Sequence, residues 1–201
     1  MALANYTDLK TAVADYLART DLTSVIPTFI SLAETRMGRD VRIMEMLTQT
    51  TLSITSASAN MPSDFLELRE IHFDTDPVTP LVYQTPEQFY ANGLQNNAGQ
   101  PVYFSFVDNV IKFSPTGTPA TVSVLYYAQP TALSDSNLTN VFTSNCMDAL
   151  LYGSLAEGSA YLMDDANVQK WAALYDRALQ SIYQNNLGKI NPNTSLSVKA
   201  G

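Results

Sequence analysis

The apolar residues of this chain change their spacing twice, and this change limits the folds that the chain can adopt. From about residue 7 to 44 they recur every three or four positions, the period of a helix with one buried face. From about 47 to 134 they occur in short runs rich in β-branched residues and separated by Pro, Gly, Asn and Asp, which is typical of strands. From about 147 to 182 the helical period returns. This order predicts an α+β protein.

Two helices are expected before the strands. The first, residues 8–19, follows Thr7, whose hydroxyl can cap the helix start. The second, residues 26–44, follows Asp21 and Ser24, whose side chains can do the same.

Two further helices are expected after the strands, separated by a very short turn at Asp164-Asp165, which is a strong N-cap site. Because none of the four helices can bury its apolar face alone, we expect one antiparallel helical bundle with a small antiparallel β domain inserted into it. The expected domains are residues 1–45 with 138–187 for the bundle, 46–137 for the β domain and 188–201 for an extended C-terminal arm.

The middle region predicts a small sandwich or barrel of short strands. Asp108-Asn109 lies between two apolar runs and indicates a tight hairpin. Thr85, followed by Pro86, opens a short helix that reaches about Ala91. The expected strands are 50–55, 68–73, 81–84, 102–107, 110–113 and 121–127.

Composition excludes several classes of function. The formal net charge of −8 argues against a protein that grips nucleic-acid phosphates, because such binding needs clustered Lys and Arg. Cys146 is the only cysteine, so no disulfide within the chain and no Cys-based zinc site can form. No apolar run approaches the roughly 20 residues of a membrane span, and the N-terminus lacks a signal pattern. We expect a protein made in the cytoplasm of its producing cell.

Residues that could carry catalysis are few and scattered. His72, the only histidine, lies between two apolar residues of an expected strand, which favours a structural role. Asp74 and Asp76 resemble the start of a calcium loop, but the downstream glycine and glutamate of such a loop are missing. The aspartates at 164–165 are explained as a helix cap. We therefore predict no catalytic, cofactor-binding or metal-binding residue and no cofactor.

The helix expected at residues 26–44 presents three surfaces, whereas a monomer needs only the apolar one. The charged residues are Arg36, Arg39 and Arg42 on one flank and Glu34 and Glu45 beyond the apolar stripe. Arg36 can pair with Asp40, but an exposed pair of this kind contributes only about 0.3–0.5 kcal/mol. The arginine flank is therefore either a solvated face or a contact with a neighbouring subunit, and the rigid fork of arginine suits the second.

The segment from residue 188 to 201 is polar, lacks periodicity and contains Gly, Pro and Asn. Such a composition is disordered in isolation. We expect a partner to hold it.

Four segments, taken in order, resemble the head-to-tail adaptor proteins of tailed phages, in particular the podovirus type. They are FISLAETRMGRDVR (29–42), MPSDFLELREI (61–71), LYYAQPTALSD (125–135) and LLYGSLAEGSAYLMDD (150–165). Together they extend from about Tyr6 to Leu187.

This resemblance implies a structural virion protein that is not an enzyme. Such adaptors form a ring, usually of twelve copies, that joins the portal protein to the tail nozzle protein in the phage neck and extends the DNA channel. DNA passes through without sequence-specific binding, and no membrane is involved. The resemblance places Glu34, Arg36, Arg39, Arg42 and Glu45 near subunit contacts in the ring. It places Lys189, Ile190, Asn191, Leu196, Val198 and Lys199 in an arm that docks onto the portal.

Two other classes remain open. One is a different neck or tail ring component, such as a tail terminator. The other is a virion-associated peptidoglycan hydrolase, for which the chain shows no constellation of catalytic residues.

Overall fold

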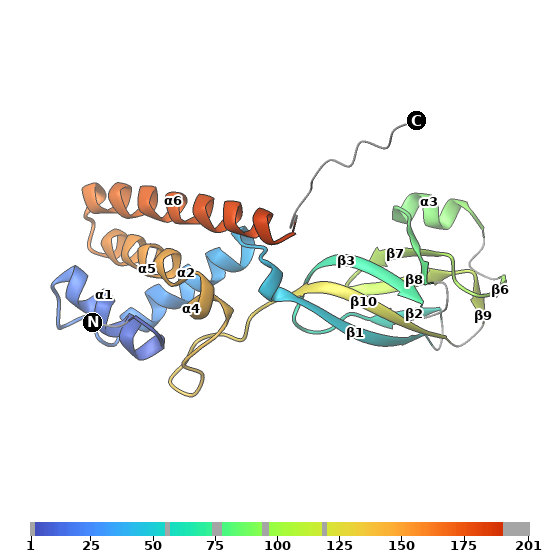
Figure 1. Ribbon diagram of the computed structural model, residues 1–201, viewed down its shortest axis with the longest axis horizontal. Coiled ribbons are helices and arrows are strands. Elements are labelled where there is room, and N and C mark those ends of the chain that lie inside the picture. Colours follow the sequence, from blue (N-terminus) through green and yellow to red (C-terminus); the bar gives the residue numbers. More distant parts are fainter. Residues whose placement is uncertain (1–2, 55–56, 74–77, 94–96, 118–119, 191–201) are drawn as a thin grey trace, which may run out of the picture. The chain divides into compact units, whose positions relative to one another are not determined.

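The computed structural model describes residues 3–54, 57–73, 78–93, 97–117 and 120–190 (Figure 1). Contacts divide the chain into two compact units. The helical unit comprises Met1–Met46 and Pro130–Gly201, and the β unit comprises Leu47–Gln129. The protein is therefore of the α+β class.

The helical unit is organised around one central helix. Its elements are α1 (Tyr6–Leu17), α2 (Ile26–Asp40), the 3-10 turn η1 (Met44–Met46), α4 (Val141–Asn145), α5 (Met147–Tyr161) and α6 (Asp165–Ile190). Helix α5 contacts α1, α2, α4 and α6, and Figure 1 shows it lying among them. Nine of its residues are buried, which explains why this helix is apolar around most of its circumference.

Two glycines of α5 allow the neighbouring helices to approach closely. A Cβ at Gly153 would lie 3.1 Å from the Cβ of Ala33 on α2. A Cβ at Gly158 would lie 2.8 Å from a methyl group of Leu17 on α1. Side chains at these positions would push α1 and α2 away from α5.

The starts of the two N-terminal helices differ from the prediction. Helix α1 begins at Tyr6 and is capped by Asn5, whose side chain accepts from the backbone N–H of Asp8, so the predicted cap Thr7 is wrong. The N-cap of α2 is Val25, which makes no side-chain cap. Its first turn instead uses the Leu22 carbonyl, which accepts from the backbone N–H of Ile26. The predicted caps Asp21 and Ser24 are therefore wrong as well.

Helix α2 also ends earlier than predicted, at Asp40 rather than residue 44. Val41 is extended, with φ −105° and ψ 129°. Val41 and Ile43 are both buried, so the apolar spacing changes from the helical period to alternation at this point. Both residues are β-branched, a type that favours extended backbone. Arg42 and Glu45 consequently lie outside the helix that was expected to carry them.

Helix α6 begins where it was predicted but continues further. Asp164 caps α6, because its carboxylate accepts from the backbone N–H of Asn167 at 3.2 Å. Helix α6 runs through to Ile190, so residues 188–190 are helical and do not belong to the extended arm predicted from residue 188. Leu162 and Met163 form the turn that connects α5 to α6.

The β unit is a small sandwich. Its elements are β1 (Leu47–Ile54), β2 (Ser58–Asn60), β3 (Phe65–Phe73), β4 (Thr79–Pro80), β5 (Val82–Tyr83), α3 (Pro86–Ala91), β6 (Ala98–Gly99), β7 (Tyr103–Val107), β8 (Val110–Ser114), β9 (Thr116–Gly117) and β10 (Ala120–Ala128). One sheet has the order β1-β10-β3-β4 and the other β2-β8-β7-β5, and both contribute to one core that includes Ile71, Ile111 and Val124.

Local signals in this unit are confirmed. Asp108 and Asn109 form the β7–β8 hairpin turn with φ values of 52° and 59°. Thr85 and Gln88 form a capping box at the start of α3. Most strand pairs are antiparallel, as predicted, but two short pairs are parallel: β5 pairs with β7, and β6 with β9.

Candidate assembly surface of the helical unit

Glu34 attaches the segment after β10 to helix α2. Its carboxylate oxygens accept from the backbone N–H of Leu133, both at 3.1 Å, and from Nδ2 of Asn140 at 2.6 Å. The Asn140 Oδ1 in turn accepts from two backbone N–H groups in the first turn of α4. Burial raises the pKa of Glu34, and these two donors act in the opposite direction. Glu34 therefore has partners within its own chain.

Arg36 belongs to a network that joins α2, α5 and α6. Its Nη1 lies 3.6 Å from a carboxylate oxygen of Glu157 on α5, and its guanidinium lies 5.6 Å from the centre of the Tyr175 ring on α6. The Tyr175 hydroxyl donates to Asp40 at 3.0 Å. Burial, and secondarily the Asp40 charge, raises the pKa of Tyr175, so this hydroxyl remains a donor. Arg36 thus pairs with Glu157, and Asp40 with Tyr175.

Arg42 and Asn186 fix the chain where it leaves α2. The Arg42 guanidinium donates to the carbonyls of Gly38 at 2.8 Å and Val41 at 2.7 Å, which lie at the end of the helix. Asn186 on α6 is buried and binds the backbone of the segment that follows α2. Its Nδ2 donates to the Arg42 carbonyl at 2.8 Å, and its Oδ1 accepts from the Met44 N–H at 3.0 Å.

Glu45 and Lys189 form an ion pair with a separation of 2.5 Å. The hydrogen bond from Lys189 lowers the pKa of Glu45. Both side chains are partly exposed, so the pair contributes little to stability. The structure thus brings together one residue predicted for subunit contacts and one predicted for portal docking.

Arg39 differs from the other four charged residues predicted at subunit contacts. It lies in the last turn of α2 and is exposed. Within the part of the chain that the structure describes, its guanidinium has no partner. Its charge is therefore available to another molecule.

A groove lies between the end of α2 and the C-terminal half of α6. Its volume is about 260 Å³. It is lined by Asp40, Val41, Arg42, Ile43, Leu179, Gln180, Ile182, Tyr183 and Gln184. The lining combines apolar with polar side chains, and such a lining can accept an apolar side chain of a partner. No signal in the sequence pointed to this groove, because it forms only where α6 passes the extended residues 41–43.

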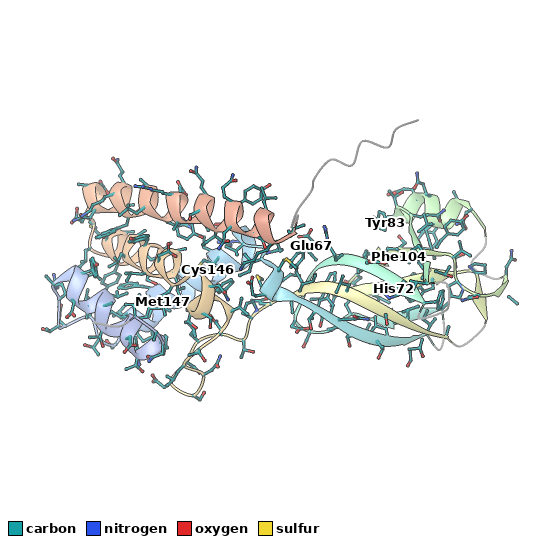
Figure 2. The ribbon with its side chains drawn as sticks, in the orientation of Figure 1. Glu67, His72, Tyr83, Phe104, Cys146 and Met147 are labelled. Atoms are coloured by element: carbon teal, nitrogen blue, oxygen red, sulfur yellow. The ribbon has the colours of Figure 1, made fainter. Side chains whose placement is uncertain are left out.

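The β unit has an open hollow of about 500 Å³. Aromatic residues Tyr83, Phe104 and Phe106 line it, together with residues 67–71 of β3. Figure 2 shows Tyr83 and Phe104 on neighbouring strands, and their ring centres are 5.6 Å apart. The bordering strand β3 carries charged side chains, and its register with β10 shifts at two points. Charged side chains and an irregular register both discourage the addition of another strand.

The candidate catalytic residues do not form a site. The Nδ1 of His72 lies 3.4 Å from a carboxylate oxygen of Glu70, on the same strand. Cys146, labelled in Figure 2 beside Met147 at the start of α5, is fully buried, and burial raises the pKa of its thiol to about 12. Asp74 and Asp76 lie outside the described residues. Among the residues that are described, no group of three or more His, Cys, Asp and Glu side chains could hold a metal ion.

The residues predicted for portal docking are described only in part. Lys189 and Ile190 form the last turn of α6, and Ile190 is exposed. Asn191, Leu196, Val198 and Lys199 lie outside the described residues. Within the ranges that the structure describes, none of the helices combines the length and apolar character that crossing a membrane requires.

Comparison with protein families gives a match over most of the chain. The sequence model of the family described as SU10 adaptor protein matches residues 4–196 and so extends over both units. No curated protein matches the chain.

Proposed function

Because the chain belongs to the SU10 adaptor protein family, which comprises structural adaptor proteins of bacteriophages, we propose that it is the head-to-tail adaptor of a tailed phage. The extent of the family match carries this proposal. A match that covers only the helices or only the strands could reflect a shared element, whereas residues 4–196 include both units. The protein acts by binding other virion proteins in the neck and not by catalysis.

In this proposal, copies of the chain form a ring of twelve that joins the portal to the tail nozzle and surrounds the DNA channel. The net charge of −8 supports a channel that repels DNA and lets it pass. The exposed Arg39 and the groove beside it support contacts between different patches of neighbouring copies. Contacts of this heterologous kind generate a closed ring when the rotation from copy to copy closes.

Docking to the portal is assigned to residues 191–201. Helix α6 ends at Ile190, and the composition of the following residues suits a segment that orders on a partner. Lys189 is paired with Glu45 within the chain, so it contributes less to docking than residues further along.

Mass measurement of the purified protein, alone and mixed with its portal protein, tests the proposal. We expect a complex that contains several adaptor copies per portal. Absence of any complex at micromolar concentration and low salt would refute it.

Two variants refine this experiment. Deletion of residues 191–201 leaves every described element intact and is expected to abolish portal binding. Arg39→Glu is expected to reduce the number of copies bound per portal, whereas Arg177→Glu, which changes another exposed helical arginine, serves as the control.

A further inference from the structure

Met163 is an unusual residue in the turn between α5 and α6. Its side chain is 90% exposed, and its backbone is left-handed, with φ 56°. Asn and Gly are the residues that tolerate this conformation well, and a single exposed methionine has no packing partner to offset the strain. The exposure of an apolar side chain and the left-handed backbone are together unfavourable for an isolated subunit. A contact with another molecule would explain why an apolar side chain stands here.

The surroundings of Met163 define the chemistry of this tip. Tyr161, just before the turn, is 57% exposed. Asp164 and Asp165 follow directly, and hydrogen bonds from Asn167 lower the pKa of Asp164, which keeps it ionised. The tip therefore consists of an apolar side chain next to two carboxylates. Its partner must offer an apolar hollow with a basic rim.

The groove between α2 and α6 offers an apolar hollow, and the basic side chain of Arg42 is part of its lining. Val41, Ile43 and Ile182 form its apolar part, Arg42 lies at its border, and Arg39 is exposed one turn earlier on α2. Its volume of about 260 Å³ accommodates one flexible side chain, and methionine adapts well to an irregular hollow. The carboxylate of Asp40 also lines the groove.

The tip cannot reach the groove of its own chain. Fourteen residues separate Asp165 from Leu179 on the same rigid helix α6, a distance of about 21 Å at 1.5 Å per residue. A contact between the two must therefore join two copies. Because tip and groove are different patches, the contact is head-to-tail and repeats from copy to copy.

We propose that Met163 of one copy inserts into the groove between α2 and α6 of the next copy, with Asp164 and Asp165 facing Arg39 and Arg42. This inference rests on the proposed ring and names the contact that builds it. It gives the exposed Arg39 a partner. It also gives the apolar groove an occupant, which is a second copy of the same chain.

Engineered cysteines test the contact. The double variant Met163→Cys with Gln180→Cys places one thiol on the tip and one at the groove. Cys146 is buried, so the native thiol does not interfere. Mild oxidation of portal-bound assemblies is expected to give a ladder of covalent oligomers on a non-reducing gel. The matched control Tyr16→Cys with Gln180→Cys, which replaces another exposed residue, is expected to give no ladder.

The outcomes are distinct. Portal-bound assemblies without a ladder overturn the inference and leave the proposed function intact. If deletion of residues 191–201 makes the thiol of the single variant Gln180→Cys more reactive toward a maleimide in the free protein, the chain's own C-terminal segment occupies the groove, and this result also overturns the inference. Failure of the unmodified protein to bind portal overturns both.

A second measurement separates assembly from folding. Met163→Asn relieves the left-handed strain and removes the apolar side chain, so we expect the isolated subunit to be at least as stable as the wild type. Its copy-to-copy affinity should fall about 10-fold or more, while Met163→Leu should stay within a few fold of the wild type. Normal assembly of the asparagine variant would overturn the inference.

Discussion

The substitution Asn186→Ala isolates the link between α6 and the segment that follows α2. Asn186 is 6% exposed and makes two hydrogen bonds across this link. Alanine removes both bonds and leaves the N–H of Met44 and the carbonyl of Arg42 without their partner.

The expected loss of stability relative to the wild type is about 1.5 kcal/mol. A buried polar group left without a partner costs about 1–3 kcal/mol. For the N–H of Met44 and the carbonyl of Arg42 we take the low end of this range, because a small hollow beside Asn186 can admit a water molecule that replaces the lost partner. Alanine favours the helix by about 0.5 kcal/mol more than asparagine does, and this difference offsets part of the loss. For a chain of this size, a loss of about 1.5 kcal/mol lowers the melting temperature by roughly 3–6 °C.

The adjacent residue supplies the control. Asn185 is exposed on the same turn of α6, so Asn185→Ala gains the helix propensity without losing a buried bond. Trp171 is the only tryptophan and lies on α6, so its fluorescence during urea unfolding reports the helical unit alone. If Asn186→Ala and Asn185→Ala unfold within about 0.5 kcal/mol of each other, the assigned role of Asn186 is wrong.

Two further predictions concern titratable groups. The pKa of Glu45 is lowered in the folded state, so its pairing with Lys189 stabilises the fold above the unfolded pKa near 4.5 and is lost as the pH falls through the lower folded value. Glu45→Gln should therefore lower the unfolding free energy by less than about 1 kcal/mol at pH 7, and by progressively less as the pH falls below 4.5. A difference that does not shrink as the pH falls would contradict the pairing. The thiol of Cys146 should react with a maleimide only after unfolding, because it is fully buried and its pKa is raised to about 12. Mass spectrometry measures the extent of labelling. Rapid labelling of the native protein at pH 7 would contradict this prediction.

The charged residues of the candidate surface were visible in the sequence, but their partners were not. Helical periodicity placed Glu34 and Arg36 on different faces of one helix. It could not reveal that Glu34 binds Asn140, which is 106 residues away, or that the Arg42 carbonyl binds Asn186, which is 144 residues away. Such pairings depend on how elements pack, and a single sequence carries no signal for that. The sequence pattern treated Arg36, Arg39 and Arg42 alike. In the part of the chain that the structure describes, Arg36 and Arg42 have partners within the chain, and the guanidinium of Arg39 does not.

The sequence by itself determined the order of helices and strands, the hairpin at Asp108-Asn109 and the caps at Thr85 and Asp164. These features depend on neighbouring residues, because backbone preference, side-chain period and capping act over a few positions. The tertiary structure alone decided the end of α2 at Asp40, because burial of Val41 and Ile43 outweighs continuation of the helix. It also decided the parallel pairing of β5 with β7 and the groove beside α6. These features arise from packing between segments far apart in the chain, which local preferences cannot specify.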